Sequence, residues 1–100
     1  MQKWIYALPL LALAWGHQVK AADIEAGKAK ATVCAACHGV DGKASVPVYP
    51  HLAGQNSAYL LKQMKAFKEG SRTEPLMAPF MAMLNEADME NLAAYYASLK

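Results

Sequence analysis

The stretch "CAACHG", residues 34–39, contains both cysteines of this 100-residue chain. Two thiols three positions apart, followed by a histidine, can close a disulfide, bind a metal ion, exchange with other disulfides or hold a haem. Each of these sites requires different surroundings, so the remainder of the chain has to decide among them.

The sequence lacks the features that a zinc site or a thiol-exchange site requires. A structural zinc site takes four ligands, and the available donors beyond the amino-terminal segment are Cys34, Cys37, His38 and His51. The adjacent Cys37 and His38 are awkward ligands for one tetrahedral ion. A thioredoxin-like pair is expected beside a β-strand, and no strand pattern is present. A disulfide closing so small a ring would stabilise the fold only weakly.

The pattern C-x-x-C-H is the attachment signature of c-type haem. In such a site the two thiols form thioethers with the haem, and the histidine ligates the iron. We therefore predict one covalently bound haem c, with Cys34 and Cys37 as tethers and His38 as an axial ligand. A bound haem would also supply a large apolar group around which a short chain can pack.

The first residues have the layout of a secretory signal. Lys3 precedes an apolar run, residues 4–15, and a polar run then closes on small residues. As a helix the apolar run would span only about 18 Å, against roughly 30 Å of hydrocarbon in a bilayer. We predict a signal peptide, residues 1–21, that is removed to leave a single domain, residues 22–100. Cleavage after Ala22, or retention of the segment as an anchor, are the alternatives.

The charge of the predicted domain excludes one class of partner. The whole chain has 10 basic and 8 acidic residues. Lys3 and Lys20 lie in the signal peptide, so the domain keeps eight of each and is neutral. Nucleic-acid binding normally requires an excess of basic residues on one face, and we expect none here. Export places the domain in the periplasm, without stable membrane insertion.

Three segments predict helices, which places the chain in the all-α class. They lie at about residues 23–34, 56–70 and 85–100, and each shows apolar residues at helical spacing or good helix formers. Asn85, with Asp88 three positions later, resembles a capping box. The Gly- and Pro-rich segments between the helices are long loops, which in a small domain are commonly functional.

Two features of the predicted helices need an explanation. A glycine inside a helix costs up to about 1 kcal/mol relative to alanine, so Gly27 indicates close approach by another element. Lys62, Lys65, Lys68 and Arg72 lie on one side of the second helix. This row is either a solvated face or a docking patch.

The chain resembles a class I cytochrome c of the short bacterial kind whose domain also occurs doubled in two-haem relatives. The resemblance covers residues 22–100 and is carried by three stretches: "GKAKATVCAACHGVDG", "VPVYPHLAGQNSAYLLKQMKAFKEGSR" and "MLNEADMENLAAYYASL". One C-x-x-C-H implies a single-haem member. The resemblance implies three main helices around one covalently bound haem, the first and last of which cross where Gly27 meets Leu92 and Tyr95.

The resemblance also implies a methionine as the second axial ligand, from the loop before the last helix. The family spacing before Leu84 selects Met77, with Met81 as the alternative. Met83 is expected against the core or the haem edge. His51 is a rival that would lower the reduction potential, but its family position is taken by varied polar residues, so we expect it at the surface.

Further residues around the haem follow from the same resemblance. The second ring nitrogen of His38 needs an acceptor that fixes its tautomer, and the family takes a proline carbonyl for which Pro47 is the matching position. Four other residues are candidates for hydrogen bonds to the haem propionates or for packing at its edge: Tyr49, Gln55, Tyr59 and Arg72.

With both axial positions taken, no open site remains for a substrate, and we expect an electron carrier rather than an enzyme. The expected protein is a soluble periplasmic monomer that docks transiently with redox partners at the haem edge. One alternative is a dedicated haem subunit of a periplasmic dehydrogenase or reductase. Another is a ligand-binding or peroxidatic haem protein with a labile sixth position. The donor, the acceptor and the potential are not encoded in any motif that we find.

Overall fold

The computed structural model describes residues 21–100; the predicted signal peptide, residues 1–21, lies outside them except for its last residue. In chain order the helices are α1 (Ile24–Lys30), the 3₁₀ helix η1 (Ala31–Val33), α2 (Ala35–His38), α3 (Ser57–Glu69), α4 (Ala78–Ala82) and α5 (Glu86–Ser98). Residues 21–100 contain no strand, which confirms the all-α class. None of the helices in this range is long and apolar enough to cross a membrane.

Local chemistry accounts for the starts of α1, α3 and α5 and for the end of α3. The side chains of Asp23 and Asn56 each accept a backbone N–H three residues further on, which caps α1 and α3. Asn85 and Asp88 form the predicted capping box, with hydrogen bonds of 2.8 and 3.1 Å. Helix α3 ends at Gly70, which adopts the left-handed conformation typical of a helix C-terminus.

The first predicted helix is shorter than expected, and α4 is additional. After Lys30 the chain tightens into η1, whose Thr32 hydroxyl donates to the carbonyl of Ala29 at 3.0 Å. Thr32 and Val33 are β-branched and lose side-chain freedom in a helix, which favours an end there. Helix α4 has only five residues, too few for a periodic pattern to be visible in the sequence. Both short turns lie next to predicted haem-binding residues.

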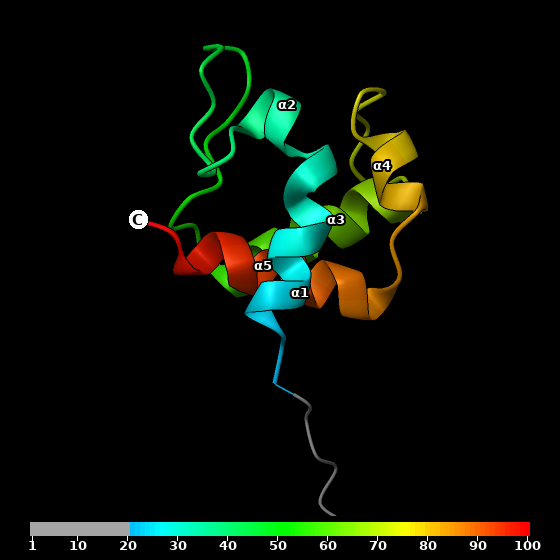
Figure 1. The fold of residues 1–100 in the computed structure, drawn as a ribbon. Helices are drawn as coiled ribbons and strands as arrows, with labels where there is room; N and C mark the ends of the chain where they lie inside the picture. Colours follow the sequence, from blue (N-terminus) through cyan, green and yellow to red (C-terminus); the bar gives the residue numbers. More distant parts are fainter. Residues whose placement is uncertain (1–20) are drawn as a thin grey trace, which may run out of the picture.

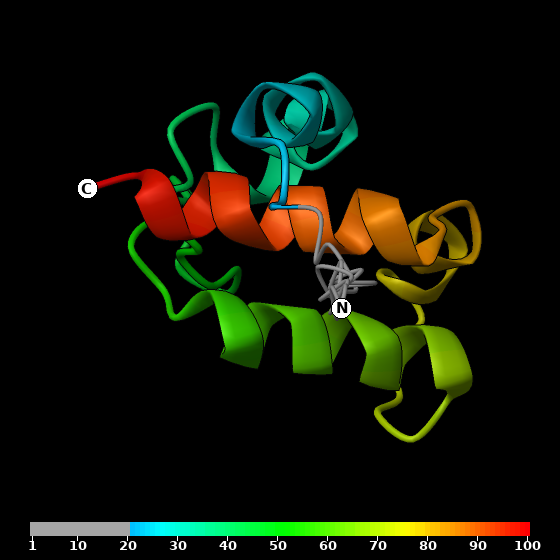
Figure 2. The same ribbon diagram turned by 90° about the horizontal axis from the view of Figure 1, so that it is seen from below.

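Helix α1 crosses α5 at the predicted glycine. Gly27 is buried, and a Cβ atom built on it would lie 2.6 Å from the carbonyl carbon of Asn91 and 2.9 Å from the Cβ of Tyr95. The backbone N–H of Asp23 donates to the Asn91 side chain at 2.8 Å, next to the same crossing. Figure 2 shows α1 passing over one face of α5 while α3 lies along the other.

A single core surrounds α5. Its buried apolar members are Ala31, Leu60, Met81, Leu84, Met89, Leu92, Ala93, Tyr95 and Tyr96. Leu92, predicted at the helix crossing, is 1% exposed. Cys34 and Met77 pack against the cluster from outside, so both segments predicted to hold the haem are joined to α5 through the core.

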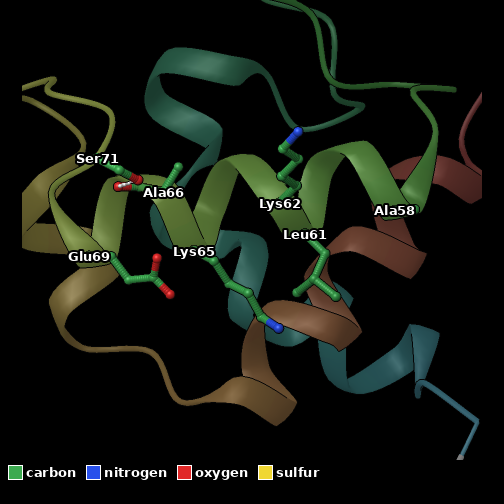
Figure 3. A pocket seen from close by; sticks show the side chains of 7 residues that line it. All are labelled: Ala58, Leu61, Lys62, Lys65, Ala66, Glu69 and Ser71. Carbon is green, nitrogen blue, oxygen red and sulfur yellow. Dashed lines mark hydrogen bonds between the residues drawn. The ribbon is translucent and has the colours of Figure 1, made fainter.

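The basic row of α3 is largely engaged within the molecule. Lys65 pairs with Glu86 at 2.5 Å, and the Lys68 ammonium donates to the backbone carbonyl of Leu84. Figure 3 shows Lys62 and Lys65 leaving α3 in different directions around a shallow hollow. Two lysines of the row therefore link α3 to the start of α5 and to the segment before it.

Gly27→Ala is expected to destabilise the protein by about 2 kcal/mol, because the added methyl group would force α1 away from α5. The cost should exceed the gain of under about 1 kcal/mol that alanine brings to a helix interior. Denaturant unfolding of the purified protein measures the difference. Lys28→Ala, at an exposed position on the same helix, is the control and should change stability by less than about 0.5 kcal/mol. A more stable Gly27→Ala protein would contradict the close crossing.

Candidate haem-attachment site

The two cysteines and the histidine lie on one helical turn. Cys34 is the N-cap of α2, and His38 is its last residue, whose N–H donates to the Cys34 carbonyl at 2.9 Å. Residues three and four apart in a helix lie on the same face, so the turn carries both sulfurs and the imidazole on one side. Both thiols are free and partly buried.

Gly39 ends this turn and reverses the chain. Its φ of 84° is in the region that favours glycine, and a Cβ atom there would lie 2.7 Å from the carbonyl carbon of Lys43. The loop is then closed by the carbonyl of Gly42, which accepts from the N–H groups of Leu52 at 2.7 Å and Ala53 at 3.0 Å. This closure brings the following residues back toward α2.

His38 is buried, with 6% of its surface exposed, and its tautomer is fixed by the loop. Its Nδ1 lies 2.9 Å from the carbonyl oxygen of Pro50. A carbonyl can only accept, so Nδ1 carries the proton and Nε2 keeps a free lone pair. The prediction of Pro47 as the acceptor is therefore wrong, because the carbonyl of Pro50 takes that place. A turn in which the N–H of Tyr49 donates to the carbonyl of Val46 leaves Pro47 exposed, three residues before the proline that reaches the imidazole.

The rival histidine lies elsewhere in the same loop. His51 is exposed, as expected, and its Nδ1 accepts the backbone N–H of Ala44 at 2.8 Å. This contact closes the loop over residues 44–51. The imidazole of His51 therefore stabilises the loop that contains Pro50.

Burial separates the three candidate methionines. Met81 is 2% exposed and belongs to the core, whereas Met83 is 67% exposed. Of the two positions expected for Met83, its exposure excludes the core, and the haem edge stays a prediction. Met77 is partly buried, packs against the core cluster and precedes α4 as its N-cap. Among these three, Met77 alone combines core contact with partial exposure.

Tyr96, which no motif in the sequence marks, belongs to the core cluster against which Cys34 packs. The hydroxyl of Tyr96 is buried and meets no hydrogen-bond partner among residues 21–100. Burial raises its pKa, and the neighbouring Cys34 raises it further. Burial likewise raises the pKa of the Cys34 thiol, the Tyr96 hydroxyl lowers it, and Cys37 raises it again. Tyr96 follows Tyr95 by one residue, about 100° around the helix, so helical spacing was the only available signal.

The four residues predicted at the haem edge are scattered. Tyr49 is half-buried in the loop, and Tyr59 is exposed on α3. Gln55 accepts the N–H of Asn56 at 2.9 Å, and Arg72 donates to Gln63 at 2.6 Å while its guanidinium lies 4.5 Å from the ring centre of Phe67. Within residues 21–100 no hydrogen bond joins any of the four to α2. Their roles toward the haem stay predictions.

The residues present suit a covalently attached haem. Two free thiols and a buried imidazole whose Nδ1 faces the Pro50 carbonyl form the donor set that haem c requires. In the described part of the chain no three His, Cys, Asp or Glu side chains gather closely enough to hold a metal ion. Fold and donor set together define a small all-α domain of the haem c class.

Comparison with known proteins agrees with this class. The chain belongs to the Cytochrome c family, whose sequence profile matches residues 24–100, and its cofactor is a covalently bound haem c. Cytochrome c4 of Pseudomonas aeruginosa is 45% identical over 100 residues, which cover the whole chain and 50% of that protein. Cytochrome c-554(548) of Halomonas halodenitrificans is 42% identical over 81 residues, 78% of this chain and 98% of that protein. The chain thus spans about half the length of the cytochrome c4 that it matches.

Solved structures share the fold. Reduced recombinant cytochrome c4 of Pseudomonas stutzeri superposes with a TM-score of 0.76 at 44% identity, over 80% of this chain and 47% of that one. Thiosulfate dehydrogenase of Marichromatium purpuratum gives 0.71 at 32% identity, over 77% of this chain and 19% of that one. The predicted class I cytochrome c fold, with its relation to the two-haem forms, is confirmed.

Gly39→Ala is expected to lower the yield of haem-loaded protein and to destabilise it by about 2 kcal/mol or more. Alanine would be strained at the positive φ and would displace the Lys43 backbone. Absorbance of the bound haem per mole of polypeptide, together with denaturant unfolding, measures both effects. Val40→Ala alters an exposed neighbour and should leave loading unchanged. Normal loading of the Gly39→Ala chain would show that this turn tolerates a side chain.

Proposed function

We propose that the chain is an electron-transfer protein of the periplasm, in which Cys34 and Cys37 tether the haem, and His38 and Met77 are the axial ligands. The observation that carries this proposal is the 2.9 Å contact between His38 Nδ1 and the Pro50 carbonyl in a buried site. This hydrogen bond engages Nδ1 and leaves Nε2 of the same ring as the nitrogen that can bind the iron. Haem c, when bound, supplies an iron that gains or loses one electron.

The residues of the chain hold the haem and set its reduction potential. The Pro50 carbonyl orients the imidazole and increases its basicity as a ligand. The soft sulfur of Met77 raises the potential relative to a second histidine. Two firm protein ligands leave no position for a substrate, and a carrier needs none, so the donor set supports electron transfer without catalysis.

Exposed apolar side chains support docking beside the cofactor. Val40 and Val48 follow α2 in the closed loop, and Leu76, Phe80 and Met83 belong to the segment around α4. Figure 1 places α2, its loop and α4 on the same side of the molecule, away from the crossing of α1 and α5. An apolar rim next to a redox centre suits a small, transient interface. We propose a monomer that uses this side toward its redox partners, after removal of residues 1–21 on export.

A second candidate function is that of a dedicated haem subunit in a larger dehydrogenase or reductase. The observation in its favour is the shared fold with part of a thiosulfate dehydrogenase, 19% of whose chain is matched. In that case the apolar rim would be covered permanently. The ligand-binding alternative requires a weak sixth ligand, which the core contact of Met77 argues against.

Met77→Ala is expected to abolish the weak far-red iron–sulfur absorption band of the oxidised protein and to let the reduced protein bind carbon monoxide. Removing the sulfur opens the sixth position while leaving the core intact. Met81→Ala is the matched control. It should keep the band but lose about 2–5 kcal/mol of stability, because its side chain is buried. The opposite pattern would identify Met81 as the ligand.

The two functions differ in how the native protein responds to salt. Purified from its own host, a free carrier is expected to elute as a single polypeptide at moderate ionic strength, because transient docking contacts are small and screened by salt. Size-exclusion chromatography before and after a salt wash measures this. A second polypeptide that stays bound in stoichiometric amount through the wash would establish the dedicated subunit instead.

A further inference from the structure

Pro50, whose carbonyl meets the imidazole of the attachment turn, lies in a weakly packed part of the chain. Residues 45–48 and Pro50 itself are exposed. One backbone hydrogen bond, from the N–H of Tyr49 to the carbonyl of Val46, lies within residues 44–51. Proline has no N–H, so Pro50 cannot be held through a backbone donor of its own. The position of its carbonyl therefore depends on the residues beside it.

One side chain joins the two ends of this segment. The Nδ1 atom of His51 accepts the backbone N–H of Ala44 at 2.8 Å. An amide N–H can only donate, so Nδ1 is the unprotonated nitrogen of this ring. Apart from the imidazole of His38 itself, no other side chain among residues 21–100 forms a hydrogen bond with the backbone of residues 44–51. His51 is thus the side chain that fastens the segment.

The same residue is joined directly to the carbonyl that His38 meets. Pro50 and His51 share one peptide unit, and this unit is planar, so a restraint on its His51 side also restrains its carbonyl. Beyond it, the N–H groups of Leu52 and Ala53 are held by one carbonyl at the start of the loop. The peptide unit is therefore restrained through the ring of His51 and through the chain that follows.

We propose that His51 is a positioning residue for the axial histidine: by binding the N–H of Ala44, it holds the Pro50 carbonyl against Nδ1 of His38. This inference rests on the proposed role of His38 as an iron ligand. The hydrogen bond to the carbonyl increases the basicity of the imidazole as a ligand. A more basic ligand favours the ferric state, so a well-held carbonyl lowers the reduction potential and a loose one raises it.

Asparagine and leucine at position 51 separate the acceptor from the shape of the side chain. The Oδ1 atom of asparagine lies as many bonds from Cα as Nδ1 of histidine and can accept the same N–H. Leucine has a similar shape to asparagine and no acceptor.

The test measures, in the haem-loaded reduced protein, the solvent exchange of the His38 Nδ1 proton by NMR, and then the reduction potential. His51→Leu is expected to speed the exchange about fivefold, the effect of losing one neutral hydrogen bond, and to raise the potential. His51→Asn should match the unaltered protein in both measurements. Ser45→Ala, an exposed change in the same loop, is the control and should alter neither.

Two results would overturn the inference: an unchanged exchange rate and potential in His51→Leu, or equal changes in the leucine and asparagine variants. Failure of the proposed function gives a different result. If the ring protons of His38 in the unaltered reduced protein lack the upfield shifts of a haem ligand, the axial role of His38 is refuted, and the inference with it.

The unaltered protein offers a measurement that needs no variant. A scalar coupling across the hydrogen bond, between the amide nitrogen of Ala44 and Nδ1 of His51, is expected in its NMR spectrum. Its absence, together with unprotected exchange of the Ala44 amide proton, would contradict the contact whether or not the variants fold.

Discussion

The close crossing of α1 and α5 at Gly27 is the contact on which the rest of the structure depends. Because no side chain separates the two backbones there, α1 packs closely against α5 where the two helices cross. The chain therefore leaves α1 close to the core. The tightening of η1 then carries Cys34 onto the cluster around α5. The attachment turn is thus held against the core from one side, and both of its cysteines are partly buried.

Both loops predicted to serve the cofactor are fastened to the core around α5. The loop after α2 ends where the N–H of Gly54 donates to the carbonyl of Tyr96, and the methionine segment ends at the buried Leu84, whose carbonyl Lys68 holds. The core around α5 therefore supports both the loop after α2 and the segment that contains Met77. Rigid support suits electron transfer, since ligands that do not move between oxidation states keep the reorganisation energy small.

The electrostatics of the domain fit weak association. Eight basic and eight acidic residues follow the predicted signal peptide, and two of the lysines on α3 are already engaged with α5 and the segment before it. Little long-range field remains to steer a strongly charged partner. The proposed docking surface, the apolar rim around the loops, would then select partners by shape and desolvation more than by charge.

Local chemistry made much of this protein predictable. The caps at Asp23 and Asn85 and the attachment turn rest on interactions between residues at most four apart, so reading neighbours along the chain was enough. The choice of Met77 followed from family spacing, and its burial agrees with that choice without testing it. Helix α4 was missed because five residues show no periodicity.

The acceptor of His38 and the burial of both Tyr95 and Tyr96 were decided only by the tertiary structure. Pro47 and Pro50 occupy one loop, and which carbonyl reaches the imidazole depends on the closure at Gly42. Adjacent tyrosines on α5 were equally suited to the core, and the fold buries both of them. The sequence by itself determined the donors, because they are contiguous and their chemistry is covalent. Their partners come from distant segments, and packing alone sets which of those segments meet.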